Sequence, residues 1–233
     1  MQASSVIEYL QRVEENPVAT MFRGQLNLEW SLKPSICRYS EPLEKGYDSL
    51  RGIEEHLLIE FEKFATPISD LRKLPLVEKL IHCQHYGLPT RLLDWSTNPL
   101  KALYFAVDDA EHDEFDGVVY AFSPLGWFEG TKDIALENSV NAFYPEILHE
   151  RLNAQDGCFS SFPLPESGFS VPELNAENYP KDVELLNEIC VPKAAKKDLR
   201  LELNMLGINH RTIYPGLDGV AKWVKSNLSG FSI

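Results

Sequence analysis

The sequence predicts an α+β domain in which helices surround small mixed or antiparallel sheets. Helix-periodic segments and short strand candidates follow one another along most of the 233 residues, and the chain has no internal repeat and no low-complexity stretch. Hydrophobic residues make up 44% and charged residues 24%, which is ordinary for a globular protein. A chain of this length can bury one sizeable core, so a single domain is the simplest organisation.

The first half of the chain alternates helices and strands. Ser4 or Ser5 can cap the first helix. Gly87 can end the helix predicted over 75–87, because glycine adopts the left-handed cap conformation. Ser96, Thr97 or Asn98 can cap the helix that follows the second strand. The predicted elements are helices over 3–15, 50–65, 75–87 and 100–112, with strands over 20–26 and 90–95.

The second half contains fewer clear elements. Prolines and glycines give residues 127–178 the composition of a loop with short helical pieces. The cationic cluster over 193–200 is expected to be the solvated face of a helix. The predicted elements are strands over 116–124 and 187–192, a helix over 193–207, and a short strand or loop leading to a last helix within 208–228.

Charge, cysteines and missing motifs exclude several classes of protein. With 22 basic and 35 acidic residues, the net charge of −13 disfavours general adhesion to nucleic acid or anionic membranes, although an arginine-lined cleft can still attract an anion. The four cysteines are scattered, without a metal-binding or redox pair. No P-loop, dinucleotide, zinc-protease or serine-hydrolase motif is present.

The N-terminal stretch lacks the basic and apolar regions of a secretory signal, and no apolar run reaches the roughly 20 residues of a membrane span. We therefore expect a cytoplasmic protein with free thiols and no membrane partner.

Three separated segments resemble the FRG-domain family. They are "FRGQ" (22–25), "QHYGLPTRLLDWSTNPLKALYFA" (84–106) and "GINHRTIYPGLDGVA" (207–221), and "ERLNAQDGCFSSF" (150–162) is similar to a further segment of it. The resemblance implies an FRG domain over 18–223, which leaves the N-terminal helix within 1–17 and a C-terminal tail over 224–233.

The chain more remotely resembles ADP-ribosyltransferases. Many of these enzymes share an arginine or histidine on a first strand, a Ser-Thr-Ser-like strand end before a helix, and a late glutamate. Arg23, the segment "WSTNPLKALYFA" and Glu188 in "LLNEICVPKAAKKDLRLEL" match in order, with Asn98 at the third place of the middle motif. The resemblance implies an ADP-ribosyltransferase-like fold. It also implies an enzyme whose substrate is NAD, with Glu188 and Arg23 as catalytic residues. The implied NAD-binding residues are Arg23, Gly24, Tyr86, Arg91, Asp94, Trp95, Ser96 and Thr97.

Arg23 must be paired, because an isolated charge inside an apolar strand is strongly unfavourable. Its guanidinium can bind a pyrophosphate or ribose, with Gly24 allowing a ligand close to the backbone, or it can pair with Asp94 or Asp218. Asp218 can also act as a structural cap of the final helix.

Each remaining candidate has both a ligand-binding and a structural interpretation. Trp95 and Tyr86 offer flat faces to a ring, but Trp95 can also belong to the core. Ser96 and Thr97 can bind a ligand or only cap a helix. Arg91 can bind phosphate or pair with Asp94. His85 can act as an acid or base or bind carbonyls.

Glu188 is the candidate catalytic carboxylate, with Gln155 as a rival for that position. A carboxylate bound to the ribose 2′-hydroxyl would stabilise positive charge developing on the sugar. We therefore expect an NAD-dependent ADP-ribosyltransferase-like enzyme, a toxin or anti-phage effector, with a protein or nucleic-acid acceptor and an antitoxin as partners. The alternatives are a non-catalytic nucleotide- or protein-binding module and an NAD glycohydrolase.

Overall fold

An antiparallel sheet organises the fold and confirms the α+β class. The computed structural model describes residues 1–39, 46–128, 134, 138–146, 150–226 and 228. Within these residues six strands form one sheet in the order β4-β5-β2-β1-β3-β6. The strands are β1 Met21–Gln25, β2 Leu92–Ser96, β3 Gly117–Pro124, β4 Asn141–Phe143, β5 Gly157–Ser161 and β6 Val183–Val191.

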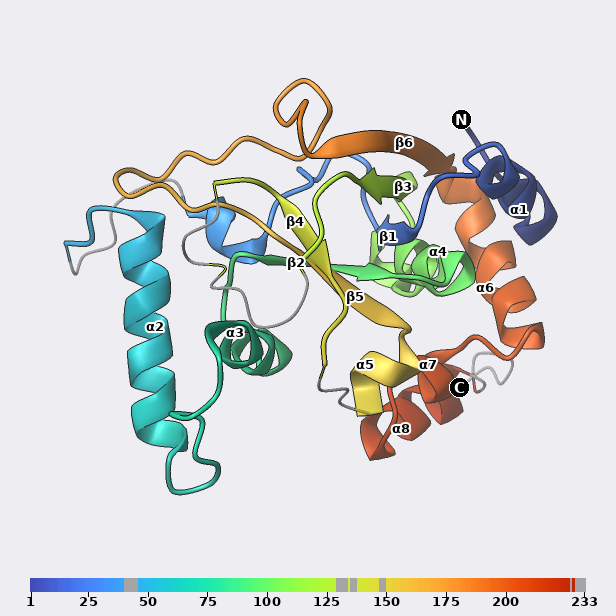
Figure 1. The fold of residues 1–233 in the computed structure, drawn as a ribbon. Coiled ribbons are helices and arrows are strands. Elements are labelled where there is room, and N and C mark those ends of the chain that lie inside the picture. The colour runs from blue at the N-terminus through green and yellow to red at the C-terminus, as the bar shows by residue number, and fades with distance from the viewer. Residues whose placement is uncertain (40–45, 129–133, 135–137, 147–149, 227, 229–233) are drawn as a thin grey trace.

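Helices cover the sheet in two groups. Figure 1 shows α2 and α3 on the side of β2, and α1 and α6 at the opposite end beside β6. The α-helices are α1 Val6–Glu14, α2 Leu50–Ala65, α3 Leu76–His85, α4 Pro99–Val107, α5 Glu150–Ala154, α6 Lys196–Met205, α7 His210–Ile213 and α8 Leu217–Ser226. The short 3-10 helices are η1 Ser35–Arg38, η2 Ala110–His112 and η3 Lys193–Ala195.

Strand alternation divides the apolar side chains between the faces of the sheet. Phe22 of β1 packs with Val119 of β3 under α1, α4 and α6. Leu92 of β2 packs with Phe159 of β5 under α2 and α3. Met21 and Trp95 point to the opposite face, where the loop segments after β1 and β5 complete the core. The two helix groups thus cover different halves of the sheet.

The sheet is nearly divided between β1 and β2. β1 pairs with β3 along its whole length, and β2 pairs with β5 along its whole length. In the described part of the chain, by contrast, β1 and β2 are paired only through Phe22 and Ser96. Beyond this pair the strands diverge, and Arg23 Nη1 donates to the Asp94 carbonyl across the gap at 2.7 Å. Next to the gap, the backbone groups of β1 therefore form no ladder with β2.

Helix α4 lies directly on β1 at Gly24. A Cβ atom at this position would stand 1.9 Å from the Ala102 carbonyl oxygen and 2.7 Å from the Ala106 nitrogen. Glycine is therefore required for the helix to approach the strand so closely.

The structure confirms most of the predicted elements, including the Ser5 cap of α1 and the left-handed conformation of Gly87 after α3. The expectation of loop with short helical pieces between residues 127 and 178 is confirmed by the short helix α5 and is wrong for the strands β4 and β5. The predicted helix over 100–112 ends at Val107, and the segment expected as strand or loop before the last helix forms α7. Residues 227 and 229–233 of the predicted tail lie outside the described residues.

Two further observations bear on the sequence predictions. Cys37, Cys83, Cys158 and Cys190 are free thiols. Among the described residues, no helix has both the length and the apolar character needed to cross a membrane.

Candidate functional site

A cavity of about 350 Å³ opens where β1 and β2 diverge. β1 and β2 form its floor, α3 and α4 contribute to its walls, and residues from the α5 and α7 regions complete it. The lining residues are Phe22–Leu26, Trp30, Arg38, Ile81, Gln84, His85, Asp94–Ser96, Phe105, Asp108, Arg151, Leu152, Gln155, Phe159 and Tyr214.

Arg23 is the cation at the gap between the strands. Its side chain is 19% exposed, and its Nη1 lies 3.8 Å from the Asp94 carboxylate. Its buried Nε has no hydrogen-bond partner among the described residues. Burial lowers the pKa of Arg23 from its usual value, and the Arg38 charge acts in the same direction while Asp94 opposes both. The guanidinium is thus only partly satisfied by the protein.

Gln25 is a second incompletely bonded side chain in the same cavity. It is 4% exposed, and its Oε1 has no partner in the described structure. Arg23 and Gln25 are two residues apart on β1, so both project to the same side of the strand. Buried polar atoms are nearly always paired, and the two residues that carry these unpaired atoms both line one cavity, which indicates a place for ligand atoms.

The cavity carries more positive than negative side chains, although the whole chain has a net charge of −13. Arg23, Arg38 and Arg151 are the lining arginines, and Asp94 and Asp108 are the lining carboxylates. The Arg151 guanidinium lies 5.1 Å from the centre of the Tyr214 ring, a cation–π contact that holds it at the wall. This local excess of positive charge favours an anionic ligand.

Asp108 is a carboxylate that sequence reasoning missed. It follows α4, and the Tyr214 hydroxyl donates to its Oδ2 over a long 3.4 Å. Burial raises the pKa of Asp108 to about 6, with the neighbouring Asp109 charge adding to the rise. A carboxyl with this pKa can exchange a proton near neutral pH.

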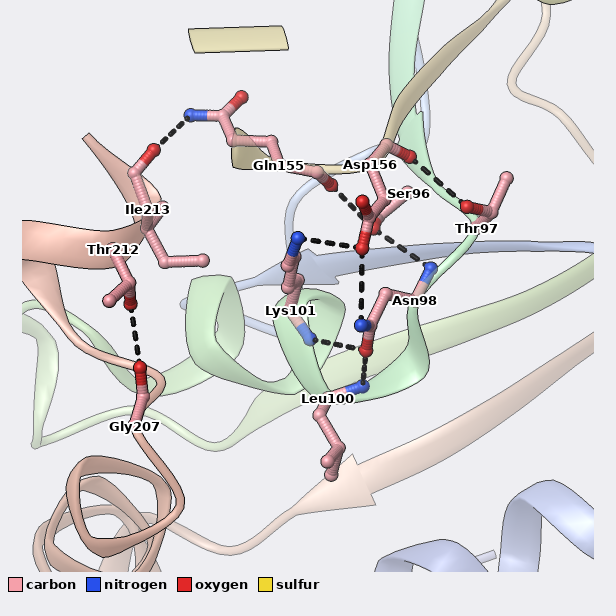
Figure 2. Close-up of polar contacts among 10 residues, drawn as sticks. All are labelled: Ser96, Thr97, Asn98, Leu100, Lys101, Gln155, Asp156, Gly207, Thr212 and Ile213. Atoms are coloured by element: carbon pink, nitrogen blue, oxygen red, sulfur yellow. Dashed lines mark hydrogen bonds and ion pairs between the residues drawn. The ribbon is translucent and has the colours of Figure 1, made fainter. Parts of the chain in front are cut away.

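The predicted Ser-Thr motif at the end of β2 is bonded mainly to the protein (Figure 2). Ser96 lines the cavity, but its Oγ donates to the Gln155 carbonyl at 2.7 Å and accepts from the Asn98 N–H at 3.0 Å. Thr97 donates its N–H to the Asp156 carbonyl at 2.9 Å. These bonds join the end of β2 to the turn before β5.

Asn98 is the residue that caps α4. Its Oδ1 accepts from the N–H groups of Leu100 and Lys101 at 3.0 and 3.4 Å, as Figure 2 shows. Its Nδ2 donates to Asp156, which also pairs with the Lys101 ammonium at 2.6 Å. The N-terminus of α4 is thus occupied by protein side chains rather than presented to a phosphate.

The predicted aromatic residues lie in different surroundings. The Trp95 indole is 4% exposed, stacks on Phe122 at 4.7 Å and donates its Nε1–H to Ser160. Tyr86 is 67% exposed beside His85 and is not among the residues that line the cavity. Trp95 therefore supports the core, while His85 and the aromatic residues Phe105 and Tyr214 face the ligand space.

Arg91 forms a buried ion pair with Glu54, so the expected alternative of a pair with Asp94 is wrong. Its Nη2 and Nε lie 2.5 and 2.7 Å from Glu54 Oε2, and both side chains are 2% exposed. The Arg91 backbone N–H also donates to Glu54, at 2.8 Å. This pair joins α2 to the residue that precedes β2.

The structure does not bring Glu188 and Arg23 into one cavity. Arg23, Tyr120 and Glu188 are direct neighbours across β1, β3 and β6, so their backbones are spaced by two strand separations, about 10 Å. Tyr120 stands between them, and Glu188 lines a separate cavity of about 470 Å³ with Glu173 and Asn187. A catalytic role for Glu188 stays a prediction without support from this arrangement.

Gln155 and Asp218 lie nearer to the Arg23 cavity. Gln155 lines it and donates its Nε2–H to the Ile213 carbonyl at 3.3 Å. Asp218, in the first turn of α8, lines an adjoining cavity together with Lys222, and that cavity shares Arg151 and Tyr214 with the first. In the described chain no cluster of three or more metal-ligating side chains could hold an ion.

The missed lining residues come from several elements. Gln25 follows the Phe-Arg-Gly motif directly, whereas Arg38 and Asp108 carry no sequence signal. Arg151 and Tyr214 lie inside the segments 150–162 and 207–221 that resemble the FRG domain, so those segments could have drawn attention to them.

Residues 18–114 match the family model of the FRG domain. The match includes Arg23, Asp94 and Asp108 and stops before Arg151 and Tyr214. The predicted extension of the domain to residue 223 stays a prediction. No curated protein and no solved structure matches the chain significantly.

Proposed function

We propose that the cavity between β1 and β2 binds a phosphate-bearing nucleotide, with NAD as the first ligand to test. The observation that carries this proposal is that Arg23 and Gln25 both line a cavity with other arginines, while one buried atom of each, Nε and Oε1, has no partner among the described residues. A ligand that supplies an acceptor to Arg23 and a donor to Gln25 would satisfy both atoms.

The size and lining of the cavity suit such a ligand. Its volume of about 350 Å³ falls in the range typical of small-molecule sites. Phe22, Phe105 and Tyr214 provide apolar ring surfaces for a base, and the three arginines provide charge for phosphate. Gly24 has no side chain to occupy the space next to the floor.

Isothermal titration calorimetry with NAD, ADP and adenosine tests the proposal. We expect ADP and NAD to bind more tightly than adenosine, because the arginines contact phosphate. Arg23→Ala should weaken ADP binding about tenfold or more, since a hydrogen bond to a charged group is worth about 1.5–3 kcal/mol. Arg72→Ala is the matched control, because Arg72 is an exposed arginine paired with Asp70 outside the cavity. A folded protein that binds none of the three ligands would refute the proposal.

A second candidate function is cleavage of NAD, either as ADP-ribosyl transfer to a protein or nucleic-acid acceptor or as hydrolysis. The observation that favours it is the presence of two carboxylates, Asp94 and Asp108, at the cavity. The bond between the ribose C1′ and the nicotinamide nitrogen would break, and nicotinamide would leave with the electron pair. The acceptor or water oxygen would then bond to C1′, and a carboxylate would take its proton.

Nicotinamide release separates the two candidates. If the chain cleaves NAD through the cavity, Asp94→Asn or Asp108→Asn should slow release at least about 100-fold, the range typical of a general base. Glu188→Gln should leave the rate unchanged, since Glu188 lines another cavity. Loss of activity in Glu188→Gln alone would restore the sequence-based assignment of that residue. Binding of NAD without release of nicotinamide would favour the non-catalytic nucleotide-binding module.

A role as a toxin or anti-phage effector with an antitoxin would require the cleavage activity first.

A further inference from the structure

We infer that Asp108 binds ribose hydroxyl groups, so that the ligand of the cavity is a ribonucleotide rather than a deoxyribonucleotide. The inference rests on the proposed function and names the ligand class for the same site. It concerns a residue for which the sequence patterns suggested no role.

The surroundings of Asp108 leave its carboxylate short of hydrogen-bond donors. Among the described residues, the Tyr214 hydroxyl is its side-chain donor, at 3.4 Å, which is near the limit for a hydrogen bond. The nearby Arg200 is engaged elsewhere, since its guanidinium donates to Asp113 at 2.5 and 2.7 Å and to the Val107 carbonyl at 2.7 Å. Asp108 is thus not part of a structural ion pair, although it is only partly exposed.

Asp94, the other carboxylate of the cavity, has a different environment. Its side chain is 60% exposed, and the Arg23 guanidinium lies 3.8 Å away. Water and a cation therefore already compensate the charge of Asp94. Asp108, by contrast, has unfilled acceptor capacity facing the ligand space.

The cavity also limits the kind of donor that can reach Asp108. Arg23, Arg38 and Arg151 line the same space, and they would repel a cationic group on a ligand. A neutral donor escapes this repulsion, and two neighbouring hydroxyls can donate to the two oxygens of one carboxylate. Phe105 and Tyr214 line the same cavity with ring surfaces, and the Tyr214 hydroxyl bonds to Asp108, as a sugar attached to a base would require. Phosphate, vicinal hydroxyls and an aromatic base together describe a ribonucleotide.

Calorimetric titrations of the full chain with ADP, 2′-deoxy-ADP and 3′-deoxy-ADP test the inference. We expect the wild-type protein to bind ADP about tenfold or more tightly than at least one deoxy analogue, as loss of a charge-assisted hydrogen bond predicts. In Asp108→Asn the preference should fall to about threefold or less, because an amide accepts at one oxygen only and carries no charge. Asp109→Asn is the matched control: it removes the same charge at the next residue, which does not line the cavity, and should retain the preference.

The outcomes separate this inference from the proposed function. Equal binding of all three nucleotides by the wild type, still weakened by Arg23→Ala, would overturn the role of Asp108 and leave the nucleotide site intact. A full preference for ADP in Asp108→Asn would also overturn it. If no nucleotide binds to the folded wild type, both the inference and the proposed function fail.

Discussion

Asp108 shows how one residue can be unfavourable for stability and useful for binding. Its pKa is raised to about 6 by burial, so the folded protein holds this proton more tightly than the unfolded chain does. Such a group lowers stability as pH rises through the interval between its usual pKa and about 6, and the full penalty is present above that interval. The charged groups that act on it are Asp109 beside it, Lys222 of α8 and Arg200 of α6, together with the Tyr214 hydroxyl.

The raised pKa of Asp108 leads to a prediction about how stability depends on pH. Asp108→Asn should raise the free energy of unfolding at about pH 7.5 by on the order of 2 kcal/mol and have little effect at about pH 4. Urea unfolding of both proteins at the two pH values measures the difference. Asp109→Asn should behave in the opposite way, because hydrogen bonds from the Glu111 backbone and His112 lower the pKa of Asp109. Equal stability of wild type and Asp108→Asn at both pH values would contradict the burial of this carboxyl.

The Arg91–Glu54 pair illustrates a residue whose partner determines its role. A phosphate-binding role requires an available guanidinium, whereas Arg91 is 2% exposed and bonded to Glu54 and the Ile134 carbonyl. We predict that Glu54→Ala lowers the free energy of unfolding by about 3–5 kcal/mol, because it leaves a buried charge unpaired. Chemical denaturation measures this loss. Removing an exposed pair with Arg72→Ala should leave the unfolding midpoint unchanged, and a similarly small effect of Glu54→Ala would show that the pair is not buried.

The role of Lys196, in the cationic cluster over 193–200, also depends on its partners. It is fully buried, and its ammonium donates to the Leu26 and His112 carbonyls at 2.6 and 2.8 Å. Sequence alone identifies it as one of several similar cations, since the acceptors come from loops far away in the chain. The expectation of a solvated face is therefore wrong for this residue.

At the scale of elements, the contact between α4 and β1 shapes the cavity. α4 contributes Phe105, and Asp108 follows it, while β1 contributes Arg23 and Gln25. Their relative position depends on Gly24, over which the helix backbone passes. The strength of this contact can be tested by adding one methyl group.

We predict that Gly24→Ala lowers the free energy of unfolding by about 1–3 kcal/mol or more, because its Cβ would overlap backbone atoms of α4 that must move as a unit. Nucleotide binding should weaken as well, since the shift would separate Asp108 from β1. Gly52→Ala in α2 is the matched control. Its Cβ meets only Ser49 Oγ, at 3.6 Å, so it should stabilise the helix by about 0.5–1 kcal/mol. Thermal unfolding and calorimetry of both variants check the pair. An undisturbed Gly24→Ala protein would show that α4 does not rest on β1.

The elements that sequence reasoning missed are short and depend on pairing. The sequence of β5, "GCFSS", contains Ser160 and Ser161 and by itself resembles a loop. It forms a strand because β2 and β4 pair with it on its two sides. β4 spans only Asn141–Phe143. Long helices such as α2 were predicted to the residue because apolar spacing and capping are local properties. Strands of this length gain their stability from neighbours distant in the chain.

For the whole molecule, the gap between β1 and β2 links ligand binding to stability. Within the described residues, the backbone pairing between β4-β5-β2 and β1-β3-β6 is limited to one residue pair, and the Arg23 side chain bonds to the Asp94 carbonyl across the gap. A ligand that contacts both strands would hold the two parts of the sheet together. Binding to the folded state alone also raises its stability by mass action.

We predict that ADP at about 100 times its Kd stabilises the wild type by about 2.7 kcal/mol, observed as a rise in Tm. The same concentration should stabilise Arg23→Ala by about half as much or less, because a Kd raised about tenfold leaves about 1.4 kcal/mol. Glu188→Gln should respond as the wild type does, because Glu188 lines a different cavity. Differential scanning calorimetry measures the three shifts. An equal shift in all three proteins would place the ligand elsewhere.

Sequence alone determined the α+β class, the order of most elements, the resemblance to the FRG domain, and an arginine beside a glycine on the first strand. These follow from local periodicity, capping and one unusual motif. The tertiary structure decided which polar groups meet: Glu54 for Arg91, loop carbonyls for Lys196, and a cavity that joins Arg23 to Asp108, Arg151 and Tyr214. It also separated Glu188 from Arg23 by two strand spacings. The physical reason is that periodicity specifies which face a side chain takes, whereas its partners depend on strand register and helix packing between segments far apart in the chain.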